Sequence, residues 1–128
     1  MVGFHTNIEA ETVSNDNFRK VLFTAPHSQL VLMSLLPGEE IGTEVHPEVD
    51  QFFRFEAGQG KSILNGEELL FKANDVLIVP AGTNHNIINT STTEPLKLYT
   101  IYSPANHPGG TIHKTKAEAE AAEASTPE

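Results

Sequence analysis

Two segments decide the fold of this chain: residues 38–58, GEEIGTEVHPEVDQFFRFEAG, and residues 80–89, PAGTNHNIIN. In each, extended apolar or aromatic runs are bounded by glycine or proline, as short strands are. Each also carries side chains that can bind a metal ion. These side chains are Glu44, His46, Gln51 and His85. Their spacing is wrong for one helix face and right for adjacent β-strands, so the two segments predict the halves of one metal site.

Short strand-like runs continue on both sides of these segments. Asn65-Gly66 is the strongest hairpin signal, because both central residues of a type I′ turn need a positive φ. The expected strands are 19–24, 30–36, 41–46, 51–56, 61–64, 67–71, 76–79, 85–89 and 96–102. No βαβ alternation is visible, so many short strands separated by turns predict an all-β sandwich or barrel.

The length of 128 residues allows one domain with a modest core. We expect a single domain over residues 1–113, with its barrel core at about 18–105. Residues before Arg19 form a short polar segment that should cover a sheet edge or contact a second subunit. The Ala/Glu-rich acidic tail, residues 114–128, should be partly helical or disordered, with no catalytic role.

The amino-acid composition argues against some classes of binding partner and some kinds of chemistry for this chain. The net charge is −9 and the eight Lys and Arg residues are scattered, so nucleic acid and anionic membranes are poor partners. No apolar run approaches the ~20 residues that span a bilayer. The absence of cysteine excludes disulfides, thiolate ligands and a cysteine nucleophile, and it fits a cytoplasmic protein. No phosphate-binding glycine loop or Gly-x-Ser-x-Gly element is present.

The four candidate ligands can reach one interior point. Glu44 and His46 are two residues apart and share one face of a strand. A turn at residues 47–50 returns Gln51 to the same interior, and His85 begins a strand after its own turn. In a closed barrel these strands converge. Two imidazoles, one carboxylate and one amide oxygen suit Fe, Mn, Ni, Zn or Co and leave coordination positions open.

This spacing resembles the two signature motifs of the cupin superfamily, small β-barrels of the jelly-roll type. The first motif matches at every spacing, through Gly38, Glu44, His46, Gln51 and Gly58. Glu44 stands where the family has its first His, and Gln51 where it has Glu. The second motif matches at Pro80, Gly82, His85 and Asn89, with Asn74 in place of the leading Gly. The chain is most similar to small single-domain cupins of the bacterial mannose-6-phosphate-isomerase-like group.

The resemblance implies a cupin-type jelly roll that binds one divalent first-row ion through Glu44, His46, Gln51 and His85. Glu48 is the alternative ligand, ranked lower because only Glu44 keeps the motif's gap from Gly38. The implied activity is isomerisation by proton transfer, or O₂-dependent oxidation, of a small oxygen-rich substrate, sugar-like or bearing a carbonyl or carboxylate. The two altered ligand positions keep a second hypothesis open, a non-catalytic barrel that binds a small molecule or a cation.

Strand parity suggests what surrounds the metal. Phe53 and Phe55 share parity with Gln51, so they should face the interior, as core residues and as candidate pocket walls. Phe52 and Arg54 then point outward, where a sheet face could form a homodimer, as cupins commonly do.

The remaining candidates lie towards the end of the chain. Tyr99 and Tyr102 have opposite parity on the last strand, so one of them should face the pocket. His107 and His113 follow in a segment rich in Pro and Gly. Both could be surface or lid residues, and we expect them at the surface.

Overall fold

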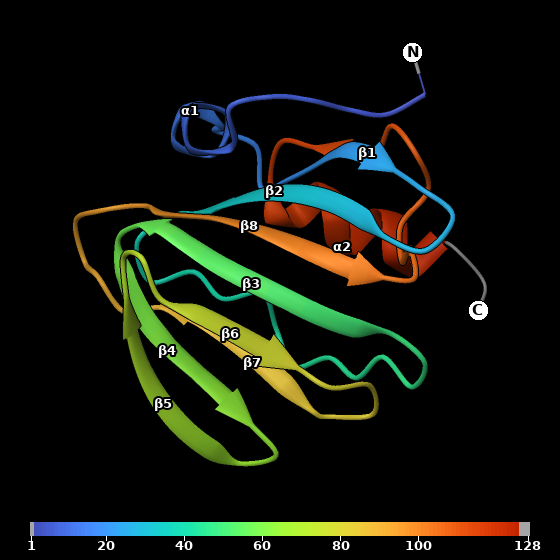
Figure 1. Cartoon of the computed structure of the whole chain (residues 1–128). Coiled ribbons are helices and arrows are strands. Elements are labelled where there is room, and N and C mark those ends of the chain that lie inside the picture. Colours follow the sequence, from blue (N-terminus) through green and yellow to red (C-terminus); the bar gives the residue numbers. More distant parts are fainter. Residues whose placement is uncertain (1, 126–128) are drawn as a thin grey trace.

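Two antiparallel sheets and two terminal helices make up the computed structural model, which describes residues 2–125 (Figure 1). The strands are β1 (Arg19–Thr24), β2 (Gln29–Leu35), β3 (Asp50–Ala57), β4 (Gln59–Leu64), β5 (Glu67–Lys72), β6 (Val76–Val79), β7 (His85–Asn89), β8 (Leu96–Ser103) and β9 (Ile112–His113). The larger sheet has the order β6-β3-β8-β2-β1-β9, and the smaller sheet has the order β5-β4-β7. This all-β arrangement confirms the predicted jelly roll.

The barrel is not closed, which corrects one expectation. Among residues 2–125 the hydrogen-bonded ladders form two separate sheets. The chain passes from β3 to β4 at Gly58, whose φ of 101° only glycine adopts readily. Ligands from different sheets therefore meet across the space between two layers and not around one continuous cylinder.

A regular strand over 41–46 was also expected, and this prediction is wrong. That segment runs beside β7 but forms only two isolated bridges, Glu40 with Ile88 and Glu44 with His85. Gly42, with a φ of 103°, interrupts the extended backbone between them. The bridges still hold the segment against β7, and they place the first half of the predicted site.

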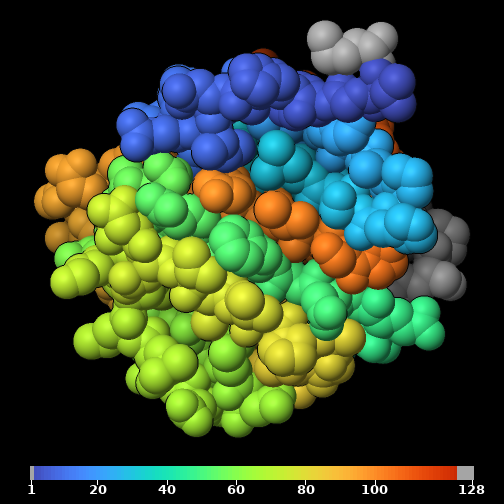
Figure 2. Space-filling model, viewed as in Figure 1, coloured from blue at the N-terminus to red at the C-terminus, as the bar shows by residue number. Residues whose placement is uncertain are grey.

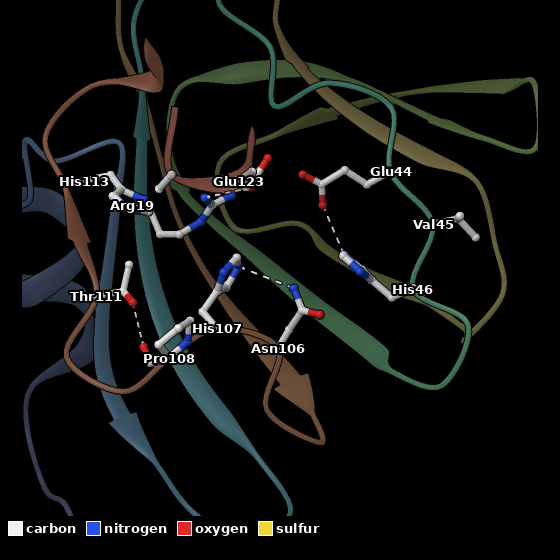
Figure 3. A pocket seen from close by; sticks show the side chains of 11 residues that line it. Arg19, Glu44, Val45, His46, Asn106, His107, Pro108, Thr111, His113 and Glu123 are labelled. Carbon is white, nitrogen blue, oxygen red and sulfur yellow. Dashed lines mark hydrogen bonds and ion pairs between the residues drawn. The ribbon is translucent and has the colours of Figure 1, made fainter. Parts of the chain in front are cut away.

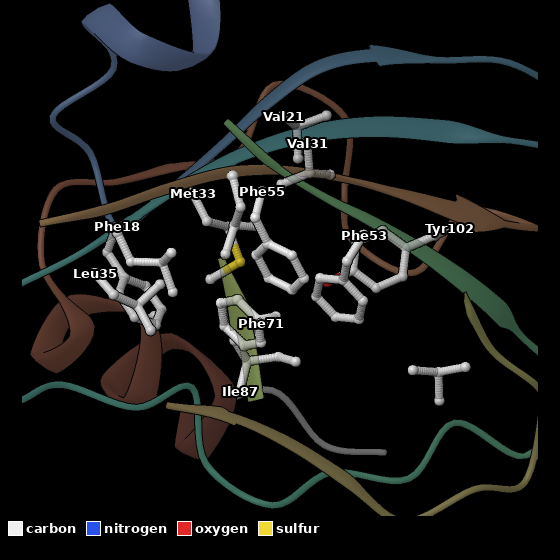
Figure 4. Close-up of a cluster of buried hydrophobic side chains, with 14 residues drawn as sticks. Phe18, Val21, Val31, Met33, Leu35, Phe53, Phe55, Phe71, Ile87 and Tyr102 are labelled. Carbon is white, nitrogen blue, oxygen red and sulfur yellow. The ribbon is translucent and has the colours of Figure 1, made fainter. Parts of the chain in front are cut away.

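The core lies between the sheets (Figure 4). Phe53 and Phe55 are fully buried, as their parity predicts. The ring of Phe55, from the larger sheet, stacks on Phe71 of the smaller sheet with 3.7 Å between centroids. Burial of each such side chain contributes about 1.5–3 kcal/mol, so this stack is a main contact that joins the layers.

Two asparagines occupy left-handed turn positions. Asn65 and Gly66 have φ values of 48° and 86°, which confirms the predicted hairpin between β4 and β5. Asn74, at the position where the cupin motif has glycine, has a φ of 78°. Asparagine tolerates this conformation better than most residues, so the change from glycine keeps the local backbone.

A helix lies near each end of the described chain. Helix α1 (Ile8–Ser14) packs against β8, β3 and β2. The buried Lys97 holds the end of α1 to the sheet, because its Nζ donates to the Asn15 carbonyl oxygen at 2.6 Å.

Helix α2 (Lys116–Ser125) forms within the predicted acidic tail, and Ala119 joins the core with 2% exposure. Residues 126–128 of the tail lie outside the described residues. Neither of the two described helices is long and apolar enough to cross a membrane.

The outer face of the larger sheet is displayed in Figure 2, where β2, β8, β3 and β6 cross the molecule in order. Ile78 on β6 is 62% exposed there, and it pairs with Phe52 on β3. The ring of Phe52 lies 6.2 Å from that of Tyr99. Phe52 and Tyr99 therefore lie on the outer face, away from the interior.

Gly60 in β4 provides a test of the packing between strands. A Cβ at this position would overlap the Ile88 carbonyl oxygen and lie 2.6 Å from Cζ of Phe71. We expect Gly60→Ala to lower the free energy of unfolding by about 2 kcal/mol or more, as overpacked core sites do. Urea denaturation measures the change. The matched control is Gly3→Ala, which meets nothing within 4 Å; equal stabilities of the two variants would contradict the packing argument.

Candidate metal centre

The centre is built on a backbone pair between Glu44 and His85. The N–H of each residue donates to the carbonyl oxygen of the other, and both distances are 2.9 Å. Side chains of such an antiparallel pair lie next to each other on one side of the ladder. His46 follows two residues after Glu44 and returns to that side. One ligand atom from each of the three residues lies within 4.8 Å of the others.

Hydrogen bonds from the turn at residues 80–82 connect the two sequence motifs. Gly82 adopts a φ of 82°, and its N–H donates to the His46 carbonyl oxygen at 2.9 Å. The N–H of Ala81 donates to the Asp50 carboxylate at 2.8 Å. The glycine of the second motif therefore fixes the backbone of a ligand in the first.

His85 is oriented for metal binding. It is 4% exposed, and its Nδ1 lies 3.0 Å from the Thr83 carbonyl oxygen, to which Nδ1–H donates. A proton on Nδ1 leaves the Nε2 lone pair free. Metal-bound histidines usually have such a partner on the second nitrogen.

Gln51 offers an oxygen without a partner. Its side chain is buried, and Nε2 donates to Thr100 Oγ1 at 2.9 Å. Its Oε1 is buried and accepts no hydrogen bond. An unsatisfied buried polar atom costs about 1–3 kcal/mol. Together with the imidazoles and the carboxylate, this oxygen fits the donor set of a divalent first-row ion.

Glu44 supplies the negative charge of the centre. Burial raises the pKa of this carboxyl group, but the contact with His46 and the charges of His46, Arg19 and His85 outweigh it, so the pKa lies below its usual value. The Glu44 Oε2 lies 3.1 Å from Nε2 of His46. The group is therefore a carboxylate at neutral pH and can ligate without losing a proton.

The centre opens onto a cavity of about 570 Å³ (Figure 3). Glu44 and His46 form one wall. The opposite wall carries polar residues from outside the two motifs: Arg19, Asn106, His107, His113 and Glu123. The cavity is large enough for a small molecule, and it places charged and polar groups on both of its sides.

His107 and His113 were expected at the surface, but both line this cavity. Gln29 positions the first of them, since its Oε1 accepts the N–H of His107 at 3.0 Å and its Nε2 donates to the His107 carbonyl oxygen at 2.7 Å. Nε2 of His107 lies 3.2 Å from the hydroxyl of Tyr102. No spacing of residues in the sequence predicts these contacts.

The remaining candidates divide by position. Tyr102 is buried, with its ring 5.9 Å from that of His46, so it is the tyrosine near the site. Phe53 lies edge-on to His85 at 6.4 Å, while Phe55 packs deeper against Phe71. Glu48 is exposed and stands outside the ligand group. The Glu44 register is therefore the one that the structure supports.

Asn89 has a structural role. Its Nδ2 donates to the carbonyl oxygens of Leu35, Leu36 and Glu94 at 3.2, 3.1 and 2.9 Å. The last residue of the second motif therefore connects β7 to the chain around β2 and β8. Within this motif, His85 is the candidate metal ligand.

Residues 31–102 match the family model of the cupin domain. The chain belongs to the cupin family. It is 52% identical over 126 residues to the uncharacterized protein YrkC of Bacillus subtilis, a match that covers 94% of this cupin and 67% of that protein. The predicted family is confirmed, and the mannose-6-phosphate-isomerase-like group within it stays a prediction.

Solved structures agree with this cupin fold. The crystal structure of BH2720 from Bacillus halodurans has a TM-score of 0.90 and 45% identity, and the match covers 92% of this chain and 93% of that one. A predicted oxalate decarboxylase from Thermotoga maritima has a TM-score of 0.57 and 26% identity over 60% of this chain and 66% of that one. This cupin thus shares the fold and carries a Glu-His-His group that could hold a metal ion.

His107 gives a pH-dependent prediction. Burial, with the charge of Arg19, lowers the pKa of His107 from 6.5 to about 4. Between these values the unfolded chain binds a proton that the folded chain does not, so the free energy of unfolding should fall as pH drops from 6.5 towards 4. His107→Asn should flatten this dependence, by less than the limit of about 1.4 kcal/mol per pH unit for one proton. Urea denaturation of metal-free protein from pH 7 to 4.5 measures it.

The exposed His27 gives the matched control, His27→Asn, which should keep the slope of the unaltered chain. An unchanged slope in His107→Asn would show that this histidine does not contribute to acid sensitivity.

Proposed function

We propose that this cupin is a divalent-metal-dependent enzyme that acts on a small oxygen-rich substrate. One observation carries the proposal: Glu44, His46 and His85 bring their ligand atoms within 4.8 Å of one another. Two of the three, Glu44 and His46, line a cavity of about 570 Å³. A fold-stabilising role alone does not require three ligating groups to converge, with two of them at the wall of a cavity.

The ion would be held by Glu44, His46 and His85, with Gln51 as a fourth ligand; Fe, Mn, Ni, Zn and Co all suit this set. Bound there, it would act as a Lewis acid that polarises a substrate carbonyl or hydroxyl oxygen. The protein's own contribution is to orient the substrate in the cavity and to keep His85 in one tautomer through the Thr83 carbonyl oxygen.

Two reaction classes each have a supporting feature. Isomerisation by proton transfer is favoured by the hydrogen bond between Tyr102 and His107. Burial raises the pKa of Tyr102, so its hydroxyl stays protonated and can donate to a ring at the cavity wall. Oxidation that consumes O₂ is favoured by the two-histidine, one-carboxylate ligand set, which is typical of non-haem Fe(II) oxygenases.

The second candidate is a non-catalytic cupin that binds a small molecule or a cation. Its supporting feature is the pair of changes from the family's motif at Glu44 and Gln51. Turnover separates the two candidates.

Metal binding is the first test. We expect one Mn, Fe, Ni, Zn or Co ion per chain after supplementation, measured by elemental analysis and calorimetry. Glu44→Ala and His85→Ala should each weaken binding about 100-fold or more, since loss even of a partner hydrogen-bonded to a ligand costs 10–100-fold. His27→Ala, at an exposed histidine, should bind as the unaltered chain does. Protein that stays metal-free under these conditions would remove the proposal.

Turnover is the second part of this test. Metal-loaded protein would be assayed with hydroxy-acids, oxo-acids and simple sugars, under nitrogen and in air. Turnover under nitrogen that His46→Ala and His85→Ala abolish identifies an isomerase, and turnover only in air identifies an oxygenase. Binding without turnover in either atmosphere would favour the non-catalytic cupin.

We further propose a cytoplasmic homodimer that forms through the outer face of the larger sheet (Figure 2). Ile78 and Val76 are 62% and 51% exposed on that face, beside Phe52. Ile78→Lys should shift the chain from dimer to monomer in sedimentation equilibrium, since a charge would have to be desolvated at the interface. A monomeric unaltered chain would contradict this proposal.

A further inference from the structure

We propose that the cavity contains an anion-binding subsite centred on Arg19, which holds the carboxylate of a small acid that carries a second oxygen donor. In the structure, Glu123 of α2 occupies the subsite. The placement of the second oxygen at Glu44, His46 and His85 rests on the proposed metal-dependent function. The carboxylate subsite itself does not need the metal.

Arg19 is a buried cation whose hydrogen bonds are not satisfied. Its side chain is 2% exposed and contributes to the cavity wall. Its Nε is buried and has no hydrogen-bond partner. A buried guanidinium costs several kcal/mol unless it is paired and hydrogen-bonded, and it offers five donors in a planar fork that matches a carboxylate. At the cavity wall Nη1 of this fork already contacts a carboxylate, that of Glu123, so an anion in the cavity could take the same place.

The neighbouring His113 also has a buried nitrogen without a hydrogen-bond partner. His113 on β9 is the ladder partner of Arg19 on β1, and it also lines the cavity. Its Nδ1 is buried without a hydrogen-bond partner. Side chains of two adjacent strands, each with a buried nitrogen that has no hydrogen-bond partner, therefore line the same cavity.

The partner that Arg19 does have is a poor structural anchor. Nη1 of Arg19 lies 3.3 Å from Oε1 of Glu123, whose side chain is 55% exposed. Exposed carboxylates gain little from ion pairs. Helix α2 has a firmer attachment at Ala119, which is 2% exposed in the core and lies one turn before Glu123 on the same face. Glu123 can therefore withdraw while the helix stays in place.

The identity of this partner also indicates the class of ligand. Glu123 shows that a carboxylate fits at Arg19, and a single negative charge from a ligand would replace the one that leaves. Arg19 faces Glu44 and His46 across the cavity (Figure 3). An acid bound at Arg19 could thus extend a hydroxyl or carbonyl oxygen towards the candidate metal ligands on the opposite wall.

The test compares glycolate with its uncharged analogue glycolamide, using full-length chain made metal-free by chelation. Calorimetry and the ¹⁵N–¹H signal of the Arg19 side chain report binding. We expect glycolate to bind about tenfold or more tightly than glycolamide, because only glycolate offers the charged acceptor, and to shift the Arg19 signal. Equal affinities, or an unmoved Arg19 signal, would overturn the inference.

Two substitutions should act in opposite directions. Arg19→Gln should reduce glycolate binding to the glycolamide level, while the chain still binds the metal ion, since Arg19 is not among the candidate ligands. Glu123→Gln should tighten glycolate binding about threefold or more, because it removes an internal competitor. Glu120→Gln, on the same helix with a side chain 65% exposed, is the matched control and should change nothing. Weaker or unchanged glycolate binding in Glu123→Gln would mean that the ion pair only holds the helix.

The outcomes separate this inference from the proposed function. Glycolate that binds only to metal-loaded protein, with the same affinity in Arg19→Gln, would place the carboxylate on the metal alone and overturn the subsite. Glycolate that binds through Arg19 in a chain that takes up no metal would support the subsite and remove the metalloenzyme.

Discussion

The reciprocal backbone pair between Glu44 and His85 is the contact on which the site depends. It brings together two segments that are far apart in the sequence and sets their side chains next to each other without any side-chain contact. Because main-chain hydrogen bonds form regardless of side-chain identity, the pairing can persist when a ligand residue changes. This explains how Glu44 can stand at a family histidine position and still face the same point.

The core and the site are continuous. The inner face of the larger sheet is apolar at one end and polar at the other. Phe55 of β3 lies beside Leu98 of β8 at the apolar end, Phe53 lies beside Thr100, and Gln51 lies beside Tyr102 at the polar end. The aromatic stack fixes the separation of the sheets at one end. The polar end then keeps a defined spacing, which a metal site needs more than a hydrophobic core does.

The sequence was informative where function depends on local spacing. Glu44, His46 and His85 could be found because strand parity and two turns determine where they point, and Asn65-Gly66 because its turn has a strict backbone requirement. The segment 41–46 differs from its prediction because Gly42, with a φ of 103°, interrupts the extended backbone. The open barrel could not be foreseen, because closure depends on how the sheets diverge after Gly58.

The opposite wall of the cavity could not be predicted in the same way. Arg19 shares parity with the buried Val21, which is a weak sign that it faces inward, but nothing in the sequence pairs it with Glu123. His107 reaches the cavity through the hydrogen bonds that Gln29 makes to its backbone, a tertiary effect without a motif. Such residues become visible only once the path of the chain after β8 is known.

The four candidate ligands do not all belong to one layer. Glu44, His46 and His85 are carried by the smaller sheet and the segment bound along its edge, whereas Gln51 lies on β3 of the larger sheet. An ion that engaged all four would therefore act as a clasp between the layers, and its binding energy would oppose their separation. Conversely, a guest that forced the layers apart would release the glutamine first and leave a three-donor site with one more vacant coordination position.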